Sequence, residues 1–241
     1  VMYLPERILS EDGIEMHFAT NHIGHFLFTC LLMPKLLTAA EGNTAKGATR
    51  IINVGAISPT MARMRWSDIN FDKKNKDLPE EEQPLYDSHR VWGATGDLGE
   101  KAYLPLEGYH QSKVANLLFS IAANQRLYSK HGILSLTLHP GVIRTELGRN
   151  MTPESIEAVE NMAKKGIFSF KTAGAGAATS LVAALDPKLG NGETKDGKEN
   201  YGVFLLDCQI CDKALPSAVS SDEADKLWKL SEELVKEKFA W

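Results

Sequence analysis

The sequence predicts an α/β fold with a parallel sheet, built as one domain over residues 1–241. Three short apolar runs, at residues 50–55, 133–138 and 202–207, have the composition of buried strands. Segments with helical periodicity separate these runs, and an alternation of strands and helices is typical of a parallel sheet. Hydrophobic residues make up 43% of the chain, which is enough for one sizeable core.

The first predicted helix begins after Ser10, an N-cap residue followed by two acidic residues that favour the positive end of a helix dipole. Apolar residues recur at helical spacing from Ile14 to Leu31, and Pro34 is expected to kink or end the helix. Because no apolar run reaches the ~18–20 residues that span a bilayer, residues 23–37 are interpreted as a buried helix.

The rest of the chain is divided by a polar segment at residues 62–107, which has few periodic apolar residues and predicts a long loop that is functional or partly disordered. Four further segments are predicted to be helices from their apolar spacing and their flanking Thr, Pro or Gly residues: 109–128, 152–165, 172–185 and 224–238.

The composition bears on partners and location. A net charge of −4 gives no electrostatic reason to expect nucleic acid or an anionic membrane. Three cysteines and the lack of a signal peptide favour a reducing, cytoplasmic compartment, and we expect no transmembrane segment. A homo-oligomer is left open. The chain opens on Val1, which suggests a fragment.

The pair Tyr109 and Lys113 has a spacing of four residues, which places a phenol and an ammonium on one helix face. A nearby cation favours the phenolate and is expected to lower the tyrosine pKa. Such a tyrosine can exchange a proton with a hydroxyl or a carbonyl. The motif is weak alone, since a core Tyr beside a solvated Lys has the same spacing.

Other motifs strengthen the functional interpretation. They are NHIGHF at 21–26, NV at 53–54, YHQSK at 109–113 and HPGVIRT at 139–145. In this order they resemble the short-chain dehydrogenase/reductase family, especially its retinol-dehydrogenase-like branch. The resemblance covers nearly the whole chain and implies a Rossmann-like doubly wound parallel sheet. It also implies an NAD(P)-dependent oxidoreductase that interconverts an alcohol and a carbonyl, with NAD and NADP left undistinguished.

The resemblance implies roles for particular residues. Tyr109 corresponds to the general acid/base, and Lys113 to the residue that lowers its pKa and holds the nicotinamide ribose. Asn21 corresponds to an asparagine that helps hold a water, although a structural amide on a helix face is the alternative. The expected cofactor contacts are a turn that meets the nicotinamide carboxamide and a hydroxyl that meets a phosphate: Pro140, Gly141, Val142 and Thr145.

The chain departs from the family pattern in two places. The serine that polarises the substrate oxygen is replaced by Ala56, and Ser58 is either a substitute hydroxyl or an ordinary loop serine. Val1-Met2 resembles the residues just after the family's Asn-Asn-Ala-Gly turn. The first βα units, with the glycine-rich turn that holds the pyrophosphate, are therefore expected to be missing.

The function hypotheses are an enzyme for a lipophilic small molecule, with residues 146–170 as a substrate flap, and a non-catalytic binding or scaffolding module. A third hypothesis is a poorly folded fragment with an exposed sheet edge. No metal site is expected, because Cys208 and Cys211 lack a second ligand pair. The glycines at residues 93–99 follow no strand and are interpreted as a loop.

Overall fold

A four-stranded sheet lies at the centre of the computed structural model, which describes residues 1–43, 45–190 and 200–241. The strands lie in the order β1 (Arg50–Val54), β2 (Leu134–His139), β3 (Phe204–Leu206) and β4 (Gln209–Ile210). The first three are parallel, and β4 is antiparallel to β3. The predicted α/β class and the three predicted strands are confirmed.

The fourth strand was not predicted from the sequence. It follows β3 through a tight turn in which Asp207 and Cys208 both have positive φ angles, of 50° and 64°. Non-glycine residues rarely adopt this conformation, and hairpin turns are usually recognised by Gly or Asn-Gly. This turn contains neither, so the sequence did not predict the hairpin. Cys30, Cys208 and Cys211 are free thiols.

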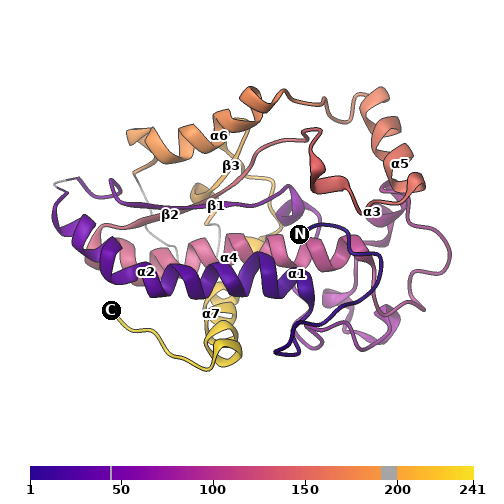
Figure 1. Ribbon diagram of the computed structural model, residues 1–241, viewed down its shortest axis with the longest axis horizontal. Coiled ribbons are helices and arrows are strands. Elements are labelled where there is room, and N and C mark those ends of the chain that lie inside the picture. The colour runs from indigo at the N-terminus through magenta and orange to yellow at the C-terminus, as the bar shows by residue number, and fades with distance from the viewer. Residues whose placement is uncertain (44, 191–199) are drawn as a thin grey trace.

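Helices cover both faces of the sheet (Figure 1). The helices α2 (Gly24–Glu41), α4 (Pro105–His131) and α7 (Ser221–Val235) lie on one face, and α6 (Ala173–Leu185) lies on the other. Two smaller helices, α3 (Tyr86–Val91) and α5 (Pro153–Lys164), lie beyond the end of the sheet. This two-sided cover is the arrangement of a doubly wound sheet.

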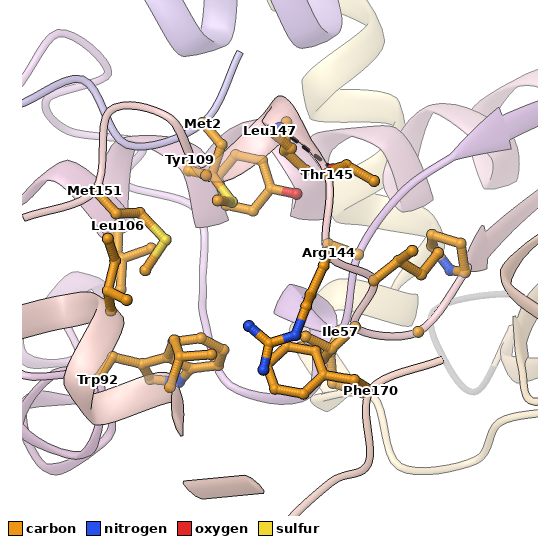
Figure 2. Close-up of a pocket in the computed structure, with 18 of the residues that line it drawn as sticks. Met2, Ile57, Trp92, Leu106, Tyr109, Arg144, Thr145, Leu147, Met151 and Phe170 are labelled. Atoms are coloured by element: carbon orange, nitrogen blue, oxygen red, sulfur yellow. Dashed lines mark hydrogen bonds between the residues drawn. The ribbon is translucent and has the colours of Figure 1, made fainter. Parts of the chain in front are cut away.

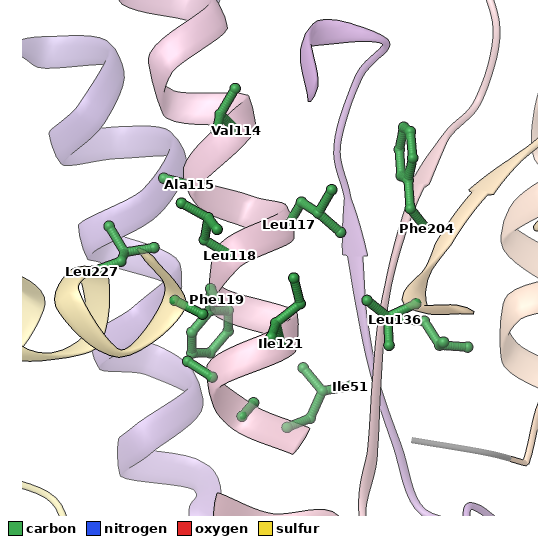
Figure 3. Packing of buried hydrophobic residues seen from close by; sticks show 14 of the residues in the cluster. Ile51, Val114, Ala115, Leu117, Leu118, Phe119, Ile121, Leu136, Phe204 and Leu227 are labelled. Carbon is green, nitrogen blue, oxygen red and sulfur yellow. The ribbon is translucent and has the colours of Figure 1, made fainter. Parts of the chain in front are cut away.

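The core lies between α4 and the sheet (Figure 3). Val114, Leu117, Leu118 and Ile121 of α4 are fully buried, as their helical spacing predicts. Burial of an aliphatic side chain of this size stabilises a fold by about 1.5–3 kcal/mol. The helix ends where Gly132 takes a left-handed conformation with a φ of 69°, which glycine adopts without strain. Its first residue is Pro105, so it starts earlier than predicted.

The first helix differs from its prediction at both ends. It begins with α1 (Met16–Phe18), whose N-cap is Glu15, whereas the Ser10 hydroxyl accepts a hydrogen bond from the amide of Ile14 in a preceding turn. The chain then passes through a π-helical turn, Ala19–Ile23, into α2. Pro34 does not end the helix, because α2 packs on the core on both sides of it. Met33 before it is buried, and partly buried side chains after it contact the core: Leu36, Leu37 and Ala40.

The exposure of α2 also corrects the prediction of a buried helix. Phe26, Cys30 and Met33 face the core, but Phe28 and Leu31 are each 61% exposed. By length and composition alone, the continuous helix from Met16 to Glu41 could cross a membrane, contrary to the expectation that no run was long enough. In the fold this helix packs on α4.

The segment at residues 62–107 is more ordered than predicted. It contains α3 and short 3₁₀ turns, and it is organised around the fully buried Arg65. The Arg65 guanidinium donates two hydrogen bonds to the Asp68 carboxylate, at 3.1 and 2.6 Å. The Arg65 backbone amide donates a hydrogen bond to Gln111 Oε1 of α4 at 3.1 Å. A buried ion pair of this kind fixes the path of a polar segment.

Candidate active site

A cavity of about 600 Å³ opens at the carboxyl ends of β1 and β2. Because these strands are parallel, the loops that follow them meet at one edge of the sheet, where ligands of open α/β sheets bind. The loop after β1 contributes Ala56 and Ile57, and the loop after β2 contributes residues 139–149. The first turns of α4 complete the wall with Tyr109 and His110.

Tyr109 and Lys113 share one side of α4, as their spacing predicts. The Lys113 ammonium lies 5.9 Å from the centroid of the Tyr109 ring and donates a hydrogen bond to the Val54 carbonyl at 2.9 Å. The Tyr109 hydroxyl points into the cavity (Figure 2). Among the residues that the structure describes, no protein group forms a hydrogen bond with that hydroxyl, so it is free to bind a ligand.

The electrostatics of this pair differ from the expectation. Burial raises the pKa of Tyr109 to about 12, whereas the sequence predicted a lowered pKa. Burial also lowers the pKa of Lys113 to about 8. The reason is that both side chains leave water on folding, which disfavours the phenolate and the ammonium alike. In this structure desolvation outweighs the attraction between the two groups.

Asn21 lies in the π-helical turn and is buried. Its side-chain amide donates to the Ser112 hydroxyl at 3.0 Å and to the Val1 carbonyl at 2.8 Å. Its backbone carbonyl accepts a hydrogen bond from Asn116 at 2.8 Å. These bonds tie the first helix to α4 one turn beyond Tyr109, so Asn21 lies next to the cavity wall rather than in it.

The turn after β2 brings backbone into the cavity. Pro140, Gly141 and Val142 line it, and Gly141 has a φ of 90°, which an L side chain rarely adopts. A Cβ atom at Gly141 would lie 2.6 Å from Cδ of Lys171, so the stem of that lysine packs against the bare turn. Thr145 also lines the cavity, and its hydroxyl accepts a hydrogen bond from the Leu147 amide at 3.2 Å.

Comparison with curated proteins gives relatives over nearly the whole chain. It is 34% identical to the short-chain dehydrogenase TIC 32 A, chloroplastic, of Brassica napus over 238 residues, which are 98% of this chain and 61% of that protein. It is 30% identical to human retinol dehydrogenase 14 over 227 residues, 94% of this chain and 54% of that protein. The chain belongs to the short-chain dehydrogenase/reductase family. It therefore spans about three fifths or less of the length of these relatives.

Two further comparisons concern the fold and the protein-family models. A crystal structure of an uncharacterized protein from Mycobacterium Paratuberculosis superposes with a TM-score of 0.52 and 22% identity, over 100% of this chain and 66% of the other. At that identity the likeness shows the fold alone. No protein-family model matches the chain.

This short-chain dehydrogenase/reductase carries Ala56 at the cavity wall, where the family pattern has a serine. Ser58 lies in the same wall, but none of its surface is exposed, and its hydroxyl forms a hydrogen bond with His110 Nδ1 at 2.9 Å. The structure thus brings Ser58 to the site without presenting its hydroxyl to a ligand. Sequence reasoning missed His110, although it lies within the YHQSK motif.

The outer part of the cavity is apolar. Its wall is formed by side chains from the loops, from α4 and from α5: Met2, Ile57, Trp92, Leu106, Met151, Ile156, Val159 and Phe170. Residues from the predicted flap at 146–170 supply part of this wall. Tyr3 contacts this segment, because its hydroxyl lies 2.8 Å from the Ser155 hydroxyl.

Two arginines, Arg144 and Arg149, also line the cavity. Arg144 forms two hydrogen bonds with Glu160 of α5, at 2.6 and 3.0 Å, and lies 3.9 Å from the centroid of the Phe170 ring.

Among the described residues there is no cluster of three or more His, Cys, Asp or Glu side chains suited to a metal ion. The glycines at residues 93–99 lie in a loop after α3.

Proposed function

We propose that the chain is the catalytic part of an NAD(P)-dependent oxidoreductase that interconverts an alcohol and a carbonyl on a lipophilic molecule. The observation that carries the proposal is the Tyr109 hydroxyl, which has no hydrogen-bond partner among the described residues and points into an apolar cavity. Lys113 stands beside it at 5.9 Å from the ring. Family membership supports an oxidoreductase, and the residue roles below are our proposal.

The residues present fit the nicotinamide end of a dinucleotide. At Gly141 the backbone itself forms part of the cavity wall, and a Cβ at this position would collide with Lys171. Pro140, Val142 and the Thr145 hydroxyl extend this wall next to Tyr109. We assign these four residues to the nicotinamide and the adjoining phosphate, and Lys113 to the ribose. The nicotinamide, when bound, supplies or accepts a hydride.

The protein moves the proton. In carbonyl reduction the Tyr109 hydroxyl donates its proton to the substrate oxygen, and in alcohol oxidation the phenolate takes it back. General acid–base catalysis of this kind contributes about 10²–10⁴ in rate. A raised pKa suits proton donation, because the phenol stays protonated at neutral pH. Lys113 becomes a stronger electrostatic partner once a phenolate forms, and Asn21 holds the helix that carries both residues.

The substrate class follows from the wall of the cavity. A cavity of about 600 Å³ lined by methionine, tryptophan, phenylalanine and aliphatic side chains favours an apolar substrate. A retinol dehydrogenase among the relatives is consistent with that class. NAD and NADP are left undistinguished. The cytoplasmic location stays a prediction, and one relative carries a chloroplast designation.

The test is carbonyl reduction by Tyr109→Phe. The purified chain is mixed with NADPH or NADH and decanal, and loss of nicotinamide fluorescence is followed. We expect Tyr109→Phe to lower the rate by at least about 10²-fold without loss of the folding transition. His131→Gln, at the far end of α4, is the matched control and is expected to keep the wild-type rate.

A second function is favoured by Ala56, which cannot donate the hydrogen bond of the family's serine. It is a binding module that holds a lipophilic ligand without chemistry. No turnover by the wild type with either NADH or NADPH, with decanal bound equally by the wild type and Tyr109→Phe, would support this module and refute the enzyme.

A further inference from the structure

The cavity wall contains a polar pair that the family pattern does not supply. Ser58 and His110 lie 52 residues apart in sequence, and their side chains meet through the 2.9 Å contact between Oγ and Nδ1. Both residues line the cavity, but only His110 retains exposed surface, 5% against 0% for Ser58. The imidazole, rather than the hydroxyl, is therefore the polar group that can meet a ligand.

The hydrogen bond fixes which nitrogen of His110 carries the proton. Ser58 Oγ has one hydrogen to donate, and within the described part of the chain its side chain has no partner except His110 Nδ1. A buried hydroxyl without an acceptor costs about 1–3 kcal/mol. Ser58 therefore donates to an unprotonated Nδ1, and a neutral imidazole must then carry its hydrogen on Nε2. No described protein group accepts from that Nε2–H.

His110 stays neutral because its burial outweighs the attraction of the nearby Glu107 carboxylate, which is hydrogen-bonded to another histidine. Glu107 accepts a hydrogen bond from His89 Nε2 at 2.6 Å, and the His89 ring stands 5.8 Å from the His110 ring. His110 thus faces Ser58, Tyr109 and His89 but forms no ion pair of its own. Burial lowers the pKa of His110 to about 4, so it presents an N–H donor, not a cation, at neutral pH.

The donor lies close to the proposed reaction centre. The ring centroids of His110 and Tyr109 are 6.1 Å apart, and both residues line the same cavity. Ala56, which stands where the family's serine would donate, belongs to the same wall. We assign Tyr109 and His110 as the two donors to a carbonyl oxygen in this cavity, because they are neighbours in its wall.

We propose that His110 Nε2–H, oriented by Ser58, donates the hydrogen bond to the substrate oxygen that Ala56 cannot donate. His110 is then a catalytic residue and Ser58 a positioning residue. The proposal rests on the proposed function, because it assumes that a carbonyl or alcohol oxygen lies next to Tyr109. It deepens that function by assigning the second donor to a histidine from the Tyr-x-x-x-Lys segment itself.

The first test determines the tautomer of His110 and does not depend on enzymatic turnover. In ¹⁵N-histidine-labelled protein, long-range proton–nitrogen correlations report which ring nitrogen of His110 is protonated. We expect the Nε2–H form in the wild type, and a shift of the His110 signals when decan-2-one is added. An Nδ1–H form, or His110 signals that do not respond to the ketone while those of other cavity residues do, would overturn the proposal.

The second test uses three variants in the decanal assay. The double variant His110→Phe with Ser58→Ala removes the donor without leaving an orphaned hydroxyl, and we expect kcat to fall by about 10²-fold. Adding Ala56→Ser to it restores a donor at the family position and is expected to recover most of that loss. An unchanged kcat in the double variant, with Tyr109→Phe still inactive, overturns the role of His110 alone. If Tyr109→Phe is fully active, the proposed function fails instead.

Discussion

Substituting Lys113 with methionine tests whether the site is built at the expense of stability. The ammonium is largely buried, and burial lowers its pKa from 10.5 to about 8. At about 1.4 kcal/mol per pKa unit, holding the charged lysine in the folded state at pH 7 costs about 3 kcal/mol. Methionine has a similar length, keeps the packing of the stem and removes the charge.

Part of this gain is lost with the hydrogen bond from Lys113 to the Val54 carbonyl. Val54 is exposed, so water can replace the lysine, and the loss is about 0.5–1 kcal/mol. The net expectation is that Lys113→Met stabilises the chain by about 2 kcal/mol at pH 7. For a chain of this size that corresponds to a rise in Tm of about 4–8 °C. The same variant is expected to lose carbonyl reduction.

The pH dependence gives the sign of the effect. A lysine whose pKa is lowered on folding penalises the folded state below pH 8, and the penalty fades between pH 8 and 10.5, where the unfolded state still binds the proton. Urea unfolding at pH 7 and at pH 9.5 should therefore show a difference between variant and wild type that shrinks by more than half. A less stable variant at pH 7, or a difference that grows with pH, would contradict a destabilising ammonium at Lys113.

Two other substitutions test neighbouring features. Gly141→Ala places a Cβ at a φ of 90° and within 2.6 Å of the Lys171 stem. We therefore expect about 1–2 kcal/mol of destabilisation in urea unfolding and weaker cofactor binding, measured by the change in nicotinamide fluorescence on titration. Wild-type values for both would show that the turn does not need glycine. Leu31→Lys removes a side chain that is 61% exposed on α2, so we expect less binding of a hydrophobic dye with a change in stability below about 0.5 kcal/mol. Unchanged dye fluorescence would place the accessible apolar surface elsewhere.

Local patterns predicted what depends on local periodicity. The spacing of Tyr109 and Lys113 places both on one side of α4, and the apolar runs become β1, β2 and β3. The same patterns failed where neighbours distant in sequence decide the outcome. Pro34 continues a helix because both flanking turns are packed against the core, and β4 forms because β3 offers an edge.

The chemistry of the site was less predictable than its position. The direction of the Tyr109 pKa depends on how much water the fold removes, which the spacing of Tyr and Lys does not contain. The role of Ser58 depends on His110, a partner 52 residues away, and on the absence of exposed hydroxyl surface. One feature of the sequence could have pointed to His110: its polar ring lies between Tyr109 and Lys113, which were both expected to be functional. That signal points to chemistry only once the cavity is seen.

The role of Tyr109 in proton transfer is tested by the pH dependence of kcat/KM in both directions between pH 6 and 7.5. In this window the cavity-lining residues His110 and His139, with pKa values of about 4, and Lys113, at about 8, change little. Because Tyr109 has a raised pKa of about 12, we predict that oxidation of decan-1-ol rises about tenfold per pH unit while reduction of decanal stays level. Oxidation that does not change with pH across this window would contradict Tyr109 as the group that moves the proton.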